Sequence, residues 1–196
     1  MNMKVNGKRV LGIVGSPRRG GNTETVVDEV LRGAQEAGAA VEKVILNDLD
    51  IMPCQGCDAC LDTGECVQQD DMDALLEKMR GSDVWVLGTP VYWWGPSAQF
   101  KTFLDRWYQV GPQSEVTFKG RRIIAVVALG DTDVATARHT IGMLTDALAY
   151  LEAEFFATVV ASGVNDPGQV REHPDVLAAA FQAGRESVGV QEQMSR

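Results

Sequence analysis

The chain of 196 residues carries a formal net charge of −9 and 45% hydrophobic residues, which is typical of one soluble globular domain. Apolar runs such as residues 123–129 are too short to span a bilayer, and no basic run exceeds two residues, so we expect neither a membrane nor a nucleic-acid partner. The N-terminal residues lack the apolar core of a signal peptide, which favours a cytoplasmic protein.

Short apolar runs rich in β-branched residues alternate with longer helical patterns. In chain order, strands are predicted at residues 9–14, 41–46, 83–88, 122–129 and 155–161, and helices at residues 23–37, 70–80, 98–108, 135–152 and from 174 onward. This alternation predicts a doubly wound parallel sheet with helices on both faces, in one domain over residues 1–196 with a loose tail at about 190–196. Ligands of such sheets bind at the carboxyl ends of the strands, where the loops after residues 14, 88 and 129 would converge.

The first of these loops, residues 15–23 with the sequence GSPRRGGNT, has the composition of an anion site. Glycines permit a tight turn, backbone N–H groups and hydroxyls can point inward, and Arg18 or Arg19 can add a forked donor. A dinucleotide fingerprint is absent, and Gly21-Asn22 stands where a Walker loop needs Lys followed by Ser or Thr. The loop therefore predicts a monophosphate site, with an ordinary capped turn as the alternative.

The second loop, residues 89–96, places Tyr92, Trp93 and Trp94 between two prolines. A stiff backbone with an apolar face can receive a flat ring, although these aromatics could instead cover the next helix or fill a subunit interface. One turn into that helix, Lys101 and Asp105 are spaced to form an ion pair.

The first loop, the segment TPVYWWGPSAQFKTFLDR at residues 89–106 and the order of elements together resemble NAD(P)H-dependent FMN reductases and iron–sulfur flavoproteins. The resemblance implies a flavodoxin-like fold with five parallel strands in the order 2-1-3-4-5, and FMN as the cofactor whose N5 carries the chemistry without a catalytic side chain. It implies contacts to the phosphate from Ser16, Arg18, Gly21, Asn22 and Thr23, and contacts to the ring from Pro90, Val91, Tyr92 and Trp93.

The third loop is less specific. Gly130 would let a ligand approach the backbone closely, and Asp131 could either accept a hydrogen bond from the cofactor or cap the next helix.

Four cysteines, Cys54, Cys57, Cys60 and Cys66, follow the spacing C-x2-C-x2-C-x5-C. Ligands at this spacing can each take one corner of a [4Fe–4S] cluster, and the pattern resembles the cluster motif of iron–sulfur flavoproteins. A zinc site and a metal-free loop of reduced thiols are the alternatives.

The expected function is an FMN-dependent oxidoreductase that takes electrons from NAD(P)H and passes them to a flavin, a quinone or a redox protein, with or without the cluster. Neither His139 nor His173 has neighbours in the sequence that suggest acid–base catalysis. The resemblance implies a homodimer or homotetramer, and the aromatic run would be costly to expose on a monomer. The alternatives are a non-enzymatic electron carrier of flavodoxin or ferredoxin type and a flavin-free binding module.

Overall fold

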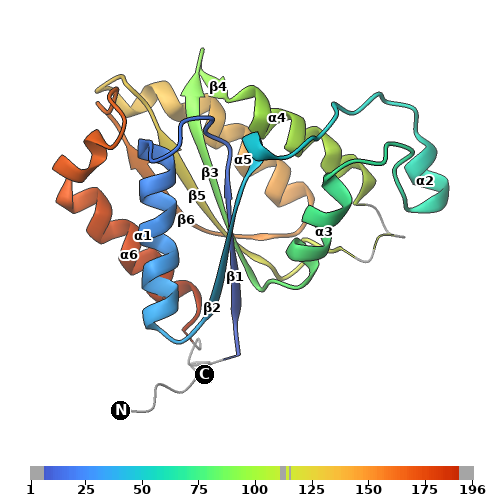
Figure 1. Ribbon diagram of the computed structural model, residues 1–196, viewed down its shortest axis with the longest axis horizontal. Helices are drawn as coiled ribbons and strands as arrows, with labels where there is room; N and C mark the ends of the chain where they lie inside the picture. The colour runs from blue at the N-terminus through green and yellow to red at the C-terminus, as the bar shows by residue number, and fades with distance from the viewer. Residues whose placement is uncertain (1–6, 111–113, 115, 190–196) are drawn as a thin grey trace.

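A parallel β-sheet forms the centre of the computed structural model, which describes residues 7–110, 114 and 116–189 (Figure 1). Its long strands lie in the spatial order β2-β1-β3-β5-β6, and a short strand, β4, pairs antiparallel with β3. The strands are β1 (Arg9–Val14), β2 (Ala40–Ile45), β3 (Val84–Tyr92), β4 (Gly95–Pro96), β5 (Arg122–Ala128) and β6 (Glu154–Ala161). With β4 set aside, this is the predicted order 2-1-3-4-5, and the flavodoxin-like fold is confirmed.

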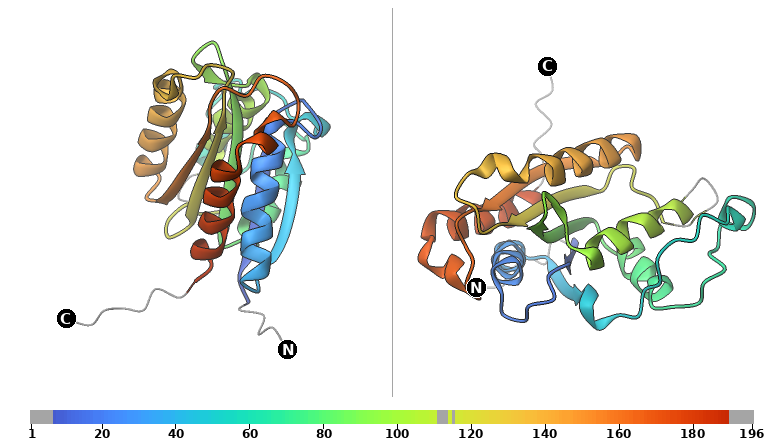
Figure 2. Two further views of the ribbon diagram at one scale, coloured as in Figure 1. Left: turned by 90° about the vertical axis from the view of Figure 1, so that its left-hand side faces the viewer. Right: turned by 90° about the horizontal axis from the view of Figure 1, so that it is seen from above.

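Helices cover both faces of the sheet (Figure 2). One face carries α1 (Asn22–Glu36) and α6 (Pro174–Ser187), and the other carries α3 (Met72–Arg80), α4 (Ala98–Asp105) and α5 (Arg138–Tyr150). Successive residues of a strand point to opposite faces, so in β1 Val10 belongs to the core with α1 and α6, whereas Leu11 belongs to the core with α3, α4 and α5. Strands buried on both faces explain the continuous apolar runs in the sequence.

Two glycines let α1 and α6 pack backbone against backbone. A Cβ atom on Gly33 would lie 2.0 Å from the carbonyl oxygen of Phe181, and one on Gly184 would lie 1.9 Å from that of Val30. Any larger side chain at either position would push the two helices apart.

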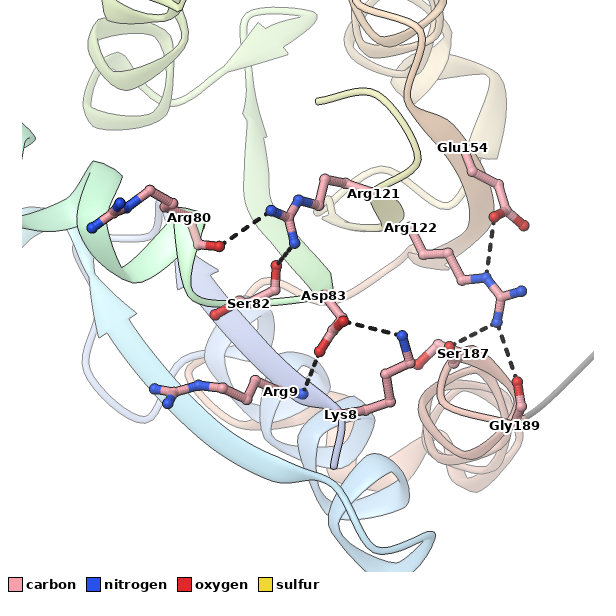
Figure 3. A network of polar contacts seen from close by, with 10 residues as sticks. All are labelled: Lys8, Arg9, Arg80, Ser82, Asp83, Arg121, Arg122, Glu154, Ser187 and Gly189. Carbon is pink, nitrogen blue, oxygen red and sulfur yellow. Dashed lines mark hydrogen bonds and ion pairs between the residues drawn. The ribbon is translucent and has the colours of Figure 1, made fainter. Parts of the chain in front are cut away.

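At the amino ends of the strands, a polar network joins β1, β3, β5 and β6 (Figure 3). The carboxylate of Asp83 accepts hydrogen bonds from Lys8 Nζ and Arg9 N, while Arg122 bonds Glu154 and the carbonyl oxygens of two residues at the end of α6. This network fixes the end of the sheet that lies opposite the predicted ligand site.

The structure differs from the predicted elements chiefly around residues 89–96. The third strand was expected to end at residue 88, but β3 continues to Tyr92 and turns into β4 as a hairpin. Trp93 and Trp94, with φ of 50° and 63°, form the turn, and both values are positive as a type I′ turn requires. Turns of this type usually contain Asn-Gly, and bulky residues rarely adopt positive φ angles. Two tryptophans at these positions therefore gave no sign of a hairpin in the sequence.

The remaining differences are small. The predicted helix at residues 98–108 ends in a 3₁₀ turn, η2 (Arg106–Gln109), and the one at 135–152 begins with another, η3 (Val134–Ala137). A short helix, α2 (Ala59–Thr63), lies within the cysteine segment and was not predicted. The expected loose tail at 190–196 lies outside the described residues. Within the described part of the chain, every helix is too short or too polar to cross a lipid bilayer.

Candidate functional site

A cavity of about 260 Å³ lies at the carboxyl ends of β1, β3 and β5, where four loops meet. Eight of the eleven residues expected to bind a cofactor line it: Ser16, Arg18, Asn22, Thr23, Pro90, Val91, Tyr92 and Gly130. The other three, Gly21, Trp93 and Asp131, are outside the set of described residues that line the cavity. The two loops singled out in the sequence therefore meet at one site.

The first loop carries donors suited to an anion. Gly21 caps α1 with an extended backbone, so the first N–H groups of that helix are free of intrahelical partners. Ser16 Oγ accepts a hydrogen bond of 3.2 Å from the backbone N–H of Arg18, and the Arg18 guanidinium donates to the carbonyl oxygen of Asn165 at 2.9 Å. Arg18 lines the cavity, whereas Arg19 turns away and pairs with Asp48. The loop thus offers backbone donors and one cationic side chain to a ligand phosphate.

The Asn22 side chain has a structural role that the sequence did not reveal. Its amide nitrogen donates to the carbonyl oxygens of Val164 and Asp166, and its amide oxygen accepts from the N–H of Val170. These bonds tie the start of α1 to the segment after β6. A ligand in the cavity would therefore meet the backbone N–H of residue 22 rather than its side chain.

A buried acid lies close behind this loop. Glu24 accepts hydrogen bonds of 2.7 Å from Gly20 N and from Lys43 Nζ, and Lys43 also pairs with Asp28. Burial opposes ionisation of Glu24, but these bonds and the charges of Lys43 and Arg19 outweigh it, so the pKa of Glu24 lies below its ordinary value. Lys43 thereby neutralises a negative charge that would otherwise repel an anion in the cavity.

The second loop is held against the first by a residue that the sequence analysis missed. Ser97 Oγ donates a hydrogen bond of 2.5 Å to the carbonyl oxygen of Gly15 and accepts one from Phe100 N, which makes Ser97 the N-cap of α4. The backbone N–H of Ser97 is in turn bound by Thr89 Oγ1 at 3.1 Å. A serine directly before a helical pattern is an N-cap signal, and this signal was available in the sequence.

The third wall comes from the loops after β5 and β6. A Cβ atom on Gly130 would lie 2.0 Å from Asn165 Oδ1, so the absence of a side chain at Gly130 makes room for Asn165, which also lines the cavity. The Asp131 carboxylate accepts from Asp133 N at 3.0 Å and from Thr136 Oγ1 at 2.7 Å. These bonds close a turn within the loop, whereas the N-cap of η3 is Asp133, whose carboxylate accepts from Ala135 N.

The four cysteines line a second, smaller cavity beside α2 and η2. Burial, together with the neighbouring Cys66, Cys54 and Cys57 thiols, raises the pKa of Cys60. Among the described residues, no group of three or more histidine, cysteine or acidic side chains is arranged to hold a metal ion. The cavity measures about 20 Å³, which is room for about one water molecule.

The donor set around this cavity nonetheless fits an anionic cluster. Arg106 and Gln109 line it, and each has buried side-chain N–H groups without a hydrogen-bond partner among the described residues, whereas the unpaired atom of Gln68 is the acceptor oxygen Oε1. An unpaired buried group costs about 1–3 kcal/mol, so a ligand that satisfied it would be favoured. Four thiols and unpaired N–H donors suit an iron–sulfur cluster, although the loop must open for a group of that size.

Arg106 and Asp70 form a buried ion pair in the wall of the cysteine cavity. Their side chains are 1% and 2% exposed, and Asp70 also accepts hydrogen bonds from Met52 N and Met72 N. Burial opposes ionisation of Asp70, but the Arg106 guanidinium and the two N–H groups outweigh it and lower the pKa of Asp70. The sequence suggested only that Asp70 begins a helix, and it gave no sign that its partner lies 36 positions away.

Comparison with known proteins places these features in context. A family model described as NADPH-dependent FMN reductase matches residues 8–165. The chain is 42% identical over 113 residues to an iron-sulfur flavoprotein of Archaeoglobus fulgidus, a match covering 58% of this chain and 50% of the relative. It is 45% identical over 98 residues to an iron-sulfur flavoprotein of Methanocaldococcus jannaschii, covering 50% and 51% of the two chains. The chain thus spans about half the length of these curated relatives.

Among solved structures, an NAD(P)H:quinone oxidoreductase from Methanothermobacter marburgensis has a similar fold. Its TM-score is 0.73, and the match covers 95% of this chain and 99% of that chain at 19% sequence identity. Identity at this level supports a common fold and no more.

Proposed function

The chain belongs to the NADPH-dependent FMN reductase family, and on this basis we propose that it is a cytoplasmic oxidoreductase that binds FMN and takes electrons from NAD(P)H. The observation that carries the proposal is the cavity at the carboxyl ends of the strands. There a loop of anion-binding character and a proline-stiffened hairpin face each other across a space of about 260 Å³. Ligands of doubly wound sheets bind at this position.

In this proposal the first loop holds the phosphate of FMN. The contacts come from the backbone N–H groups at the start of α1, from Ser16 Oγ and from the Arg18 guanidinium; the residues assigned to them are Ser16, Arg18, Gly21, Asn22 and Thr23.

The hairpin and the third loop receive the ring system. Pro90, Val91 and Tyr92 line the cavity and fix its edge, while Trp93 lies at the hairpin tip. Gly130 and Asp131 belong to the opposite loop, where Gly130 lines the cavity. Bound FMN supplies a hydride acceptor at N5, so the chain needs no acid–base pair and contributes binding and orientation.

The cysteine segment extends the proposal to a second redox group. Cys54, Cys57, Cys60 and Cys66 would hold a [4Fe–4S] cluster, which can accept one electron at a time. The unpaired donors around the cysteine cavity and the names of the two curated relatives support this assignment. The acceptor would be a flavin, a quinone or a redox protein.

One anaerobic preparation tests both parts. We expect about one FMN, four iron and four sulfide per chain, and bleaching of the flavin absorbance when NADPH or NADH is added. A protein that binds no FMN would refute the proposal. A flavin that stays oxidised with both nicotinamides would instead favour an electron carrier of flavodoxin type. Protein that still contains no iron after anaerobic reconstitution would refute the proposed cluster and would leave the proposed flavin reductase activity standing.

A further inference from the structure

Arg106 lies in the wall of the cysteine cavity and is 1% exposed. It follows α4 directly, as the first residue of η2. Its Nη1 atom makes two bonds, one of 3.0 Å to the carbonyl oxygen of Met52 and one to the carboxylate of Asp70. These contacts fix the guanidinium plane between the start of the cysteine segment and the turn before α3.

The other donors of this guanidinium are unused. Nε and Nη2 are buried and have no hydrogen-bond partner among the residues that the structure describes. Asp70 takes up only Nη1 of the guanidinium, so Nε–H and Nη2–H remain available to a hydrogen-bond acceptor in the cavity. Arg106 and the four cysteines line the same cavity, and Cys66 is close enough to act electrostatically on the guanidinium.

We propose that Nε–H and Nη2–H of Arg106 donate hydrogen bonds to sulfur atoms of the cluster held by Cys54, Cys57, Cys60 and Cys66, and that they raise its reduction potential. The inference rests on the proposed [4Fe–4S] cluster. A cluster with four thiolate ligands is an anion and becomes more negative on reduction, so N–H donors stabilise its reduced form more than its oxidised form. Asp70 holds the guanidinium in place.

The test is a redox titration of the cluster, followed by electron paramagnetic resonance, in anaerobically reconstituted full-length protein. We expect Arg106→Gln to lower the ratio of reduced to oxidised cluster at a given potential about tenfold, a shift of about 59 mV for one electron. Arg106→Lys keeps the charge and can keep the pair with Asp70, but it lacks the forked donors; a smaller shift in the same direction is expected. The FMN potential should stay unchanged in both variants.

Arg122→Gln is the matched control. It removes the same charge from an arginine that bonds Glu154 and the carbonyl oxygen of Ser187 at the far end of the sheet (Figure 3). Its cluster should keep the wild-type potential, and an equal drop there would show a general charge effect and overturn the inference.

The two proposals can fail separately. Wild-type protein that binds no iron would overturn the cluster, and this inference with it. If the wild type binds four iron and Arg106→Gln binds as much iron at the same cluster potential, the inference about Arg106 is overturned and the proposed cluster stands. If Arg106→Gln does not fold, the Lys variant decides, and an unchanged potential in that variant overturns the inference.

Discussion

The hydroxyl of Ser97 donates a hydrogen bond of 2.5 Å to the carbonyl oxygen of Gly15, across 82 positions of the sequence. It joins the two loops that we assign to the phosphate and the ring of FMN. Ser97 is fully buried, and its hydroxyl also caps α4 through Phe100 N. One side chain thus sets the distance between the two halves of the candidate site and starts the helix that follows the hairpin.

Replacing Ser97 with Ala removes this bond and the cap together. We expect the free energy of unfolding to fall by about 1–2 kcal/mol, because a cap is lost and the buried carbonyl of Gly15 is left unpaired. FMN affinity should fall as well, since the loops are no longer tied. Urea unfolding and fluorescence titration measure the two effects. As a control, Thr145→Ala removes an exposed hydroxyl that bonds Ile141 O within α5, and it should change neither quantity. A Ser97→Ala protein as stable as the wild type would contradict this role.

Arg18→Ala tests the phosphate site. Loss of a charge-assisted contact costs about 1.5–3 kcal/mol, which corresponds to roughly tenfold to a hundredfold weaker FMN binding. Riboflavin, which lacks the phosphate, should lose much less affinity. Arg19→Ala is the matched control, because Arg19 sits in the same loop but pairs with Asp48 outside the cavity. Equal losses for FMN and riboflavin would place Arg18 away from the phosphate.

Much of the fold follows from local patterns in the sequence. The apolar runs predicted all five long strands, and the spacing of Lys101 and Asp105 predicted an ion pair that the structure confirms at 2.5 Å. The composition of residues 15–23 and of the second loop pointed to seven of the eleven expected residues that line the cavity, and Gly130 of the third loop is the eighth. Each of these signals depends on neighbours within one turn or one strand.

The remaining features depend on partners far along the chain. The three side-chain bonds of Asn22 reach residues 164–170, and no local pattern distinguishes them from an ordinary helix cap. An arginine in a helical pattern is expected to face solvent, and nothing near Arg106 in the sequence indicates otherwise. It is buried because it pairs with Asp70, which belongs to another element. The positive φ angles of Trp93 and Trp94 are imposed by the pairing of β3 with β4 against their own preference.

Glu24 should make stability depend on pH in the acidic range. Burial opposes its ionisation, but hydrogen bonds from Lys43 and Gly20 N and the charges of Lys43 and Arg19 outweigh burial, so the pKa of Glu24 is lowered in the folded protein. Its contribution is therefore complete above the ordinary glutamate pKa of 4.5 and is lost as the pH falls through the lower folded value. Glu24→Gln should destabilise the protein by about 1.5 kcal/mol near neutral pH, and the difference from wild type should shrink in acid.

Urea unfolding at about pH 7 and about pH 3 measures that difference. Glu29→Gln is the control on the same helix, since Glu29 forms an exposed pair with Arg32, and exposed pairs contribute little. A Glu24→Gln variant whose deficit is the same at both pH values would contradict the assignment.

Cys57→Ser separates the two proposed redox groups. Removing one of four thiolates should abolish iron binding after anaerobic reconstitution, because serine is a poor cluster ligand. FMN binding and bleaching of the flavin by NAD(P)H should remain, since the flavin cavity shares no lining residue with the cysteine cavity. Iron and sulfide assays with anaerobic absorbance spectra measure both. Loss of flavin reduction along with iron would show that the two sites depend on each other.

Trp93→Gly tests the role of the hairpin tip. In the single chain Trp93 is 92% exposed and has a φ of 50°, a conformation that costs a bulky residue about 1–2 kcal/mol. Glycine removes this strain, but its greater freedom in the unfolded chain lowers the free energy of unfolding by about 0.5–1 kcal/mol. The relief of strain is larger, so an isolated subunit should become slightly more stable. If Trp93 is instead buried between subunits, as we propose for a homodimer or homotetramer, the same change weakens the oligomer.

We therefore expect opposite effects on the subunit and on the assembly. In analytical ultracentrifugation the Trp93→Gly protein should dissociate toward the 21.2 kDa chain at concentrations where the wild type stays associated. Once dissociated, its free energy of unfolding should equal or exceed that of the wild-type subunit. Tyr150→Ala is the control, because Tyr150 is 87% exposed at the end of α5 and outside the hairpin. A wild-type protein that sediments at 21.2 kDa would show that the aromatic tip faces solvent or another partner.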